Sequence, residues 1–298
     1  MPAKTVEEEY KKYTQLEHVL KRPDTYVGSV EDATDPQWVF DEETKRMKQV
    51  VLTYPPGLYK TFDELSVNAA DQTQRDGTLD SIKVSFNKDE KSITVENNGV
   101  GIPVSIHKEH NVHVPELIFG YLLTSSNYND SEKRTTGGKN GFGAKLANIF
   151  STRFEITIIH PESKTQYHQV FTDNMTKIEK PTMKKVTTKK GLVRVKYFPD
   201  LKRFGHTAFT DDFLKLVSRR AYDVAACTPK KVNVHLNDVK IPIKKWEDYV
   251  DLYIGPKSEI WRIHESPNER WDVVIAPSTN DFQQISFVNS ICTSKGGS

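Results

Sequence analysis

The sequence of 298 residues has only two cysteines, no long apolar run and almost no net charge. Cys227 and Cys292 are too few for a disulfide scaffold or a four-cysteine zinc site, and they are typical of a reducing compartment. The longest apolar stretch, residues 154–159, has the length of a strand and not of the ~20 residues that a membrane helix needs. The N-terminus lacks the apolar core of a signal peptide. These absences predict a soluble globular protein that makes no membrane contact.

The chain also lacks a strong excess of either charge. It has 42 Lys and Arg residues against 40 Asp and Glu residues, which gives a formal net charge of +2. A protein that grips duplex DNA mainly through phosphates is usually more basic. Composition therefore argues against a dedicated DNA-binding module, but it leaves open a part of a larger DNA-acting machine.

Helical and strand patterns are mixed along the chain. Residues 82–86 and 92–96 alternate apolar and polar side chains, which predicts an antiparallel hairpin. Apolar residues at helical spacing predict a helix from Leu58 that stops at Asp76. Short strands are expected between residues 29 and 53, further helices at 114–123, 144–150 and 211–226, and further strands at 154–159, 167–171, 193–197 and 232–237. Because helices and strands do not strictly alternate, this order favours an α+β sandwich over a doubly wound parallel sheet.

A change in pattern near residue 245 predicts a domain boundary. A new helix is expected at 246–253, followed by strands at 271–275 and 284–288. The segment 246–298 is short for a complete domain. We therefore expect a main domain over residues 29–245, a partial second domain after it, and a longer parent protein.

The helix after Leu58 places polar side chains on one face. Glu64 and Asn68, then Asp71 or Gln72, and then Arg75 follow one another at helical spacing. A carboxylate beside a neutral amide suits a hydrolytic base next to a magnesium ligand, because Mg²⁺ takes few protein oxygens and keeps phosphate oxygens and waters. An ordinary amphipathic helix with a solvated side would show the same pattern.

A strand end rich in asparagine and glycine follows the expected hairpin. Asn97 stands just before Gly99 and Gly101. An amide side chain offers both a donor and an acceptor, so it can read the edge of a base. Glycine lets a backbone come close to a ligand. A plain turn is the alternative, since Asn-Gly is a common turn dipeptide.

A glycine-rich stretch, residues 136–148, opens directly into an expected helix. Free backbone N–H groups and the helix dipole favour an anion there, and Lys139 and Lys145 add positive charge. The stretch is not a Walker A loop, because Gly143 is followed by Ala144 where that motif requires lysine. Together with the preceding two motifs, it indicates a site for a nucleoside triphosphate.

In this order and spacing, the three motifs resemble the GHKL ATPase superfamily. The resemblance to eukaryotic type IIA DNA topoisomerases covers nearly the whole chain. It is carried by residues 14–29, 62–71, 122–128, 137–145 and 284–290. Thr-Ser-Ser-Asn-Tyr at 124–128 separates this family from the chaperone, mismatch-repair and histidine-kinase branches. The resemblance implies a two-layer ATP-binding (Bergerat) sandwich followed by the start of an α/β transducer domain.

The resemblance also implies roles for individual residues. Glu64 would be the general base, Asn68 would hold Mg²⁺, and Asn97 would read the adenine of ATP. Tyr10 would reach the nucleotide site of a partner subunit. The remaining implied contacts are Ser125, Ser126 and Asn127 near the ribose and phosphates, and Lys139, Asn140, Gly141, Phe142, Gly143, Ala144 and Lys145 over the triphosphate.

The family further implies a homodimer that closes on ATP binding, with the arm 1–28 exchanged between subunits, and duplex DNA as a partner of the full-length enzyme in the nucleus. DNA cleavage needs a domain that is not present in this chain. The family's transducer lysine, which touches the γ-phosphate, has no counterpart before Ser298. We therefore expect this chain alone to hydrolyse ATP weakly.

The chain departs from the family's pattern in three places. Gln72 stands where asparagine is usual, and Lys139 stands where arginine is common, which keeps the charge but loses bidentate geometry. Val193 occupies a position where a threonine near the adenine is usual, so Asn97 would carry more of the base recognition.

Two other functions compete with this interpretation. A chaperone or kinase of the same superfamily is one, although no helix with a phosphoacceptor histidine is evident. A nucleotide-binding dimerisation module without useful catalysis is the other; Glu64 argues against it, whereas the expected truncation of the second domain argues for it.

Overall fold

The computed structural model describes residues 12–122, 142–268, 270–278 and 281–293. In these residues, nine strands form one sheet in the order β11-β10-β3-β4-β9-β5-β6-β7, and β8 pairs with β6. The strands are β3 (Ser81–Asn87), β4 (Ser92–Gly99), β5 (Ser151–His160), β6 (Thr165–Thr172), β7 (Lys177–Ile178), β8 (Thr182–Lys185), β9 (Gly191–Pro199), β10 (Asn233–Leu236) and β11 (Val239–Lys240). Their pairings are antiparallel except that of β10 with β3, which is parallel.

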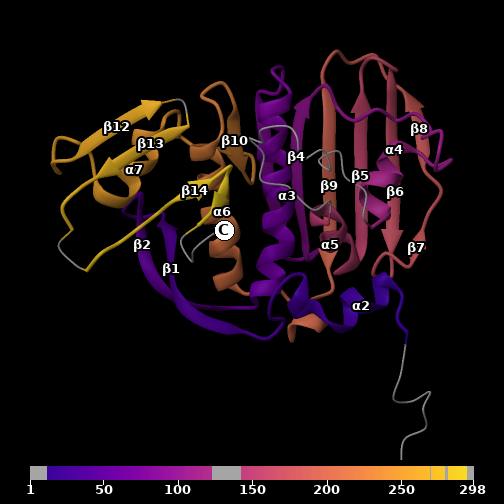
Figure 1. Cartoon of the computed structure of the whole chain (residues 1–298), viewed down its shortest axis with the longest axis horizontal. Coiled ribbons are helices and arrows are strands. Elements are labelled where there is room, and N and C mark those ends of the chain that lie inside the picture. The colour runs from indigo at the N-terminus through magenta and orange to yellow at the C-terminus, as the bar shows by residue number, and fades with distance from the viewer. Residues whose placement is uncertain (1–11, 123–141, 269, 279–280, 294–298) are drawn as a thin grey trace, which may run out of the picture.

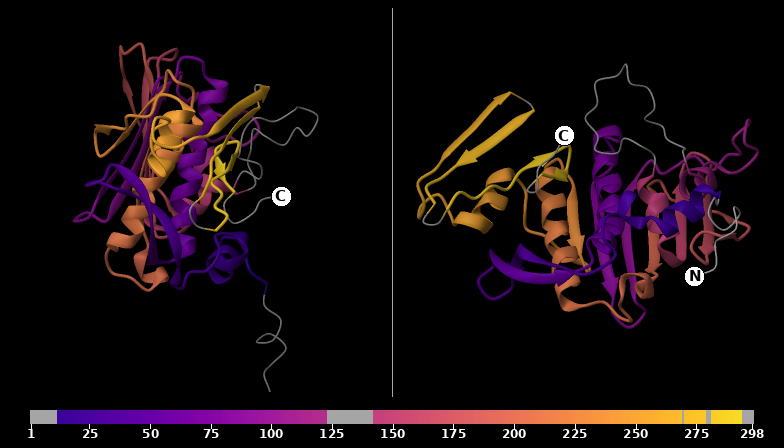
Figure 2. Two further views of the ribbon diagram at one scale, coloured as in Figure 1. Left: turned by 90° about the vertical axis from the view of Figure 1, so that its left-hand side faces the viewer. Right: turned by 60° about the horizontal axis from the view of Figure 1, so that its bottom comes forward.

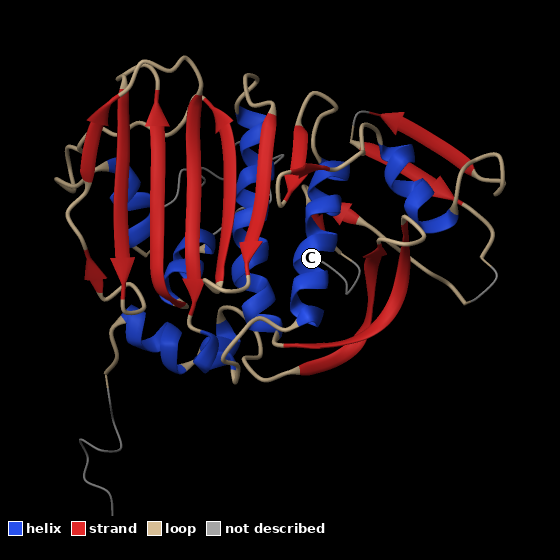
Figure 3. Cartoon of the chain, turned by 180° about the vertical axis from the view of Figure 1, so that it is seen from behind, coloured by secondary structure: helices blue, strands red, loops and turns tan. Residues whose placement is uncertain are grey.

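Helices cover one face of this sheet and leave the other open (Figure 1, Figure 3). They are α3 (Pro56–Arg75), α4 (Val114–Gly120), α5 (Gly143–Ile149) and α6 (Asp211–Cys227). Along β4, Ile93 and Val95 are buried toward the helices, whereas Glu96 pairs with Arg194 at 2.6 Å on the open face. The arrangement confirms the expected α+β two-layer sandwich. None of the described helices combines the length and apolar character needed to cross a bilayer.

Helix α3 forms because its apolar residues fall on one side. Leu58, Phe62, Leu65 and Ala69 are all buried in the main core, and burying a side chain such as Phe62 contributes about 1.5–3 kcal/mol. Pro56 occupies the first turn, where the missing N–H costs nothing, and the helix ends at the cap residue Asp76 as the sequence predicts.

Two elements near the N-terminus were not fully predicted. The expected short strands at 29–53 are one long hairpin of β1 (Ala33–Asp41) and β2 (Arg46–Tyr54), which lies beside α6. The ring of Phe40 in β1 stacks on that of Tyr222 at 4.3 Å.

Helix α2 (Gln15–Lys21) was missed because it is short and polar. Its capping box has the backbone N–H of Glu17 donating to the Thr14 hydroxyl and that of Thr14 donating to the Glu17 carboxylate.

The remaining short helices and one helix end differ from the sequence prediction. Two 3-10 helices, η1 (Pro23–Thr25) and η2 (Leu201–Phe204), connect larger elements. The helix expected at 114–123 ends at Gly120. Added side-chain bulk at Gly120 would press on the ring of Phe171, so this end of α4 packs tightly on the sheet.

The C-terminal part contains α7 (Trp246–Ile254), β12 (Ile263–Asn268), β13 (Trp271–Ile275), β14 (Phe287–Val288) and β15 (Ile291–Cys292). Figure 2 shows β12 and β13 extending away from the large sheet. The strand expected at 284–288 is only two residues long, and β12 was not predicted, because Pro267 and charged residues break its alternation. Tyr249 of α7 is 1% exposed and belongs to the main core. The proposed division near residue 245 stays a prediction.

Candidate functional site

The exposed side of α3 carries Glu64 and Asn68 one turn apart. The Glu64 side chain is 22% exposed and Asn68 is exposed, whereas Asp71 on the same helix is buried. The structure therefore leaves the first two predicted residues accessible to a ligand and places the third inside the protein.

Lys60 lies one turn before Glu64 and pairs with it. The Lys60 ammonium is 2.7 Å from Glu64 Oε1 and 3.8 Å from Asp63 Oδ2. Partial burial lowers the pKa of Lys60, but the carboxylates of Glu64 and Asp63 outweigh that effect and raise its pKa overall. The ammonium thus holds one oxygen of the Glu64 carboxylate in a defined direction. The i, i+4 spacing of opposite charges is a signal that sequence reasoning missed.

The other oxygen of Glu64 lies against the start of α5. A Cβ atom built on Gly143 would overlap Glu64 Oε2, so a larger residue there would push the carboxylate away. Gly143 is the first residue of α5, and α3 and α5 pack against each other. The end of the glycine-rich stretch and the helix carboxylate, which lie far apart in the sequence, are therefore in direct contact.

Three other residues of this stretch are buried or half-buried against the core. Lys145 is only 4% exposed, and burial lowers the pKa of its ammonium to about 8. Phe142 is half-buried, with its ring 6.1 Å from that of Tyr26. Ala144 is buried as well.

Asn97 lies on the helix-covered face of β4, in the same row as Ile93 and Val95. It is 8% exposed, and its Nδ2 donates to the carbonyl of Asn98 at 3.0 Å. The strand register puts Val193 of β9 directly beside it. The apolar position noted in the sequence is therefore a neighbour of Asn97, and α3 packs against the same strand.

Asp76 fixes the turn that follows Asn97. Its Oδ2 accepts from the N–H of Val100 at 2.7 Å, and its Oδ1 accepts from the N–H of Thr78 at 2.8 Å. Burial opposes ionisation of this carboxyl, but these hydrogen bonds prevail and lower its pKa. Gly99 has φ of 124°, and a side chain on it would overlap the Asp76 carboxylate. The glycine after Asn97 is thus required by close packing.

Seven predicted residues lie outside the part of the chain that the structure describes. They are Tyr10, Ser125, Ser126, Asn127, Lys139, Asn140 and Gly141.

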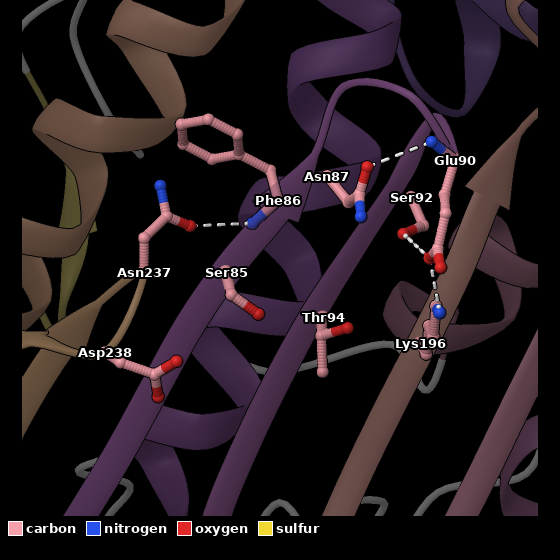
Figure 4. Close-up of a pocket in the computed structure, with 9 residues that line it drawn as sticks. All are labelled: Ser85, Phe86, Asn87, Glu90, Ser92, Thr94, Lys196, Asn237 and Asp238. Carbon is pink, nitrogen blue, oxygen red and sulfur yellow. Dashed lines mark hydrogen bonds and ion pairs between the residues drawn. The ribbon is translucent and has the colours of Figure 1, made fainter.

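A hollow lies on the open face of the sheet, turned away from α3 (Figure 4). It has a volume of about 350 Å³ and is lined by Ser85, Phe86, Asn87, Glu90, Ser92, Thr94, Lys196, Asn237 and Asp238. Its polar groups bind one another, as in the 2.6 Å pair of Lys196 with Glu90. None of the predicted site residues lines it, so we place the functional site on the helix-covered side.

Comparison with known proteins agrees with this geometry. The family model described as "Histidine kinase-, DNA gyrase B-, and HSP90-like ATPase" matches residues 53–188, which include Glu64, Asn97 and Lys145. The chain therefore carries an ATPase domain of this type.

Curated relatives and a solved structure extend the match to nearly all of the chain. DNA topoisomerase 2 from Arabidopsis thaliana is 48% identical over 99% of this chain, and DNA topoisomerase 2-alpha from Gallus gallus is 50% identical over 98%. The chain covers only 20% and 19% of these two proteins, about a fifth of their length. The crystal structure of the ATPase region of Saccharomyces cerevisiae topoisomerase II superposes with a TM-score of 0.93 at 43% identity, and the match covers 98% of this chain and 76% of that one.

Proposed function

The chain belongs to the DNA topoisomerase II family, and from that premise we propose that it is the gate that binds and hydrolyses ATP in such an enzyme. The contact between Glu64 and Gly143 carries the proposal, because it joins a carboxylate to the end of a glycine-rich stretch. Glycine-rich backbone of this kind is suited to phosphate groups. A carboxylate next to the phosphates is suited to activate water.

In this proposal, Glu64 takes the proton of the attacking water. Lys60 pairs with Oε1, so it restrains the carboxylate without occupying both of its oxygens. Positioning and charge stabilisation account for most of the catalysis of phosphoryl transfer, and a well-placed base adds roughly 10²–10⁴-fold.

Asn68 would hold Mg²⁺ with its side-chain oxygen, since it is exposed one turn beyond Glu64. A bound magnesium ion would neutralise charge on the triphosphate. Mg²⁺ keeps several waters and accepts one or two protein oxygens, so a single exposed amide fits its needs.

Asn97 would read the adenine, with Val193 closing one side of the base without adding a polar group. The buried amide of Asn97 supports this role, because a largely desolvated donor and acceptor discriminates between bases better than one in bulk water. The contacts to ribose and triphosphate are proposed for Ser125, Ser126 and Asn127 and for the lid Lys139, Asn140, Gly141, Phe142, Gly143, Ala144 and Lys145.

We propose that the gate acts as a homodimer that closes on ATP, that Tyr10 and the arm 1–28 reach the partner subunit, and that the parent enzyme passes duplex DNA through this gate in the nucleus. Residues of α2 pack on the chain's own core through Val19. The proposed exchange therefore concerns mainly the residues that precede α2. The relatives' name, DNA topoisomerase 2, supports the part of this proposal that concerns DNA.

The proposed function is tested by binding and sedimentation. A non-hydrolysable ATP analogue should bind the wild-type chain with Mg²⁺ and increase its sedimentation coefficient toward that of a dimer. Asn68→Ala should lose the gain in affinity that Mg²⁺ provides, because it removes the proposed ligand oxygen. A wild-type chain that binds no nucleotide would refute the function, and an unchanged magnesium effect in Asn68→Ala would refute the metal ligand.

Lys145 predicts a pH dependence of nucleotide binding. In the free protein its pKa is about 8, and a nearby triphosphate would raise that pKa. Binding energy from the ammonium is then fully present below pH 8 and is lost as the pH rises through the pKa of the bound state. Calorimetry between pH 7 and 9.5 should show weaker analogue binding with rising pH, with proton uptake near pH 8.5. Lys145→Met should bind weakly at every pH, and a pH profile as steep as that of wild type would contradict the assignment.

A further inference from the structure

A buried arginine links α3 to the C-terminal hairpin of β14 and β15. The Arg220 side chain in α6 has no exposed surface. Its Nε donates to Asp63 Oδ1 at 2.6 Å, and its Nη2 donates to the carbonyl of Ser290 at 2.7 Å. One planar guanidinium therefore joins the helix of the site to the turn of the hairpin.

The surroundings of Arg220 restrict its movement. Asp223 Oδ2 lies 4.0 Å from Arg220 Nη1 and 3.1 Å from Arg219 Nη2. Asp223 Oδ1 accepts from the Tyr249 hydroxyl at 2.6 Å. Buried charges are stable only with partners in good geometry, so a shift of Arg220 disturbs several interactions at once. A group held in this way transmits displacement better than an exposed ion pair does.

The turn at the far end depends on this contact. Asn289 and Ser290 have φ of 48° and 65°, the left-handed backbone that a two-residue type I′ hairpin turn requires. Asparagine is well suited to this conformation, but Ser290 stands where glycine is preferred, so any strain of the turn lies at Ser290. The hydrogen bond from Arg220 to Ser290 stabilises that conformation. The next backbone bond of the hairpin runs from the N–H of Thr293 to the carbonyl of Ser286 at 2.8 Å.

On the α3 side, the bonds of Arg220 lead through Asp63 to Glu64, the predicted general base. Asp63 precedes Glu64 in α3, and the ammonium of Lys60 lies between their carboxylates. A change of charge beside Glu64 would move Lys60 relative to Asp63. Asp63 in turn would strengthen or weaken its hold on Arg220.

We propose that Arg220 is a positioning residue that couples the carboxylate of Glu64 to the β14–β15 hairpin, so that nucleotide at the site tightens this hairpin. The proposal rests on the function proposed above. Coupling between sites is reciprocal, and couplings of this kind commonly change an equilibrium by ~5–150-fold. The hairpin contacts would equally set the orientation of Glu64.

The test is amide hydrogen exchange of Thr293, whose N–H bonds the carbonyl of Ser286, in the whole chain, with and without a non-hydrolysable ATP analogue and Mg²⁺. In wild type the analogue should slow this exchange by about fivefold or more. Arg220→Lys should reduce the effect below about twofold, because one ammonium cannot bond Asp63 and Ser290 together. Thermal unfolding of each variant confirms that it is folded.

Arg219→Lys is the matched control. Arg219 is 5% exposed, neighbours Arg220 and bonds Asp223 and the Cys292 sulfur, but its bonds do not include Asp63. In Arg219→Lys, the analogue should slow the exchange as much as it does in wild type. If both arginine variants lost the effect of the analogue equally, the proposal would be overturned, and the packing of α6 alone would explain the effect.

Asp63→Asn tests the link without nucleotide. It should speed the exchange of Thr293 in the free protein, because it removes the charge that holds Arg220. Unchanged exchange would overturn the coupling whether or not the chain is an ATPase. If a bound analogue left the exchange of the wild-type hairpin unchanged, the coupling would be overturned too, while the proposed function would stand. Failure of the analogue to bind would refute the function alone.

Discussion

Glu64→Gln is expected to lower the rate of ATP hydrolysis at least ~10²-fold while leaving nucleotide binding near that of wild type. The amide keeps the shape of the side chain and its contact with Gly143, but it cannot accept a proton from water. A steady-state phosphate-release assay measures the rate, and titration of a non-hydrolysable analogue measures the affinity. The baseline rate of this chain is expected to be low, so the assay should run at high protein concentration.

The matched control for this variant is Glu96→Gln. Glu96 has a side chain that is 17% exposed and pairs with Arg194 at 2.6 Å, which resembles the environment of Glu64, but the alternation along β4 places it on the open face of the sheet. It should hydrolyse ATP as wild type does. Near-normal turnover in Glu64→Gln would remove Glu64 from the role of base, and equal losses in both variants would point to a general effect of losing a paired carboxylate.

Arg220→Met is expected to reduce the free energy of unfolding by about 3–5 kcal/mol. Methionine fills much of the volume but leaves Asp63 without its 2.6 Å partner and removes one cation from Asp223, which has no exposed surface. Breaking a buried ion pair in this way is costly because the remaining charge is not solvated. Urea denaturation followed by circular dichroism gives the change from the midpoint and slope.

Arg203→Met serves as the comparison for Arg220→Met. Arg203 bonds Asp200 at 3.0 Å with 38% of its side chain exposed, so its loss should cost no more than about 1 kcal/mol. Similar midpoints for the two variants would show that the buried network adds little stability. A large change in slope would instead indicate that the native state has loosened.

The elements nearest to the site could be predicted from the sequence because their signals are local. The bounds of α3 follow from the apolar spacing of Leu58 and Phe62 and from the stop at Asp76. The β3–β4 hairpin follows from alternation, and the start of α5 from the glycines before it. The assignment of Glu64 to ATP chemistry came from the resemblance to a family, and local pattern alone left an ordinary amphipathic helix as an alternative.

The rest depends on contacts between distant residues. Asp63 and Arg220 are 157 positions apart, and nothing near either one in the sequence marks the other as its partner. The overlap that makes Gly143 necessary arises only when α5 packs on α3. The sequence predicts only short strands where the long β1–β2 hairpin lies. The reason is that apolar residues of the hairpin face α6 and its neighbours along only part of the two strands.

The hydroxyl of Tyr249 limits where this protein can be divided into separate domains. The change of pattern near residue 245 indicates a boundary in sequence, yet Tyr249 bonds Asp223 inside α6 from beyond it. A chain ended at residue 245 would expose the side of α6 that this tyrosine and Ser290 cover, and it would remove the hydroxyl that donates to the Asp223 carboxylate. We therefore expect the unit that unfolds cooperatively to be larger than the unit that a sequence pattern delimits, and modules exchanged between relatives should be joined beyond β15.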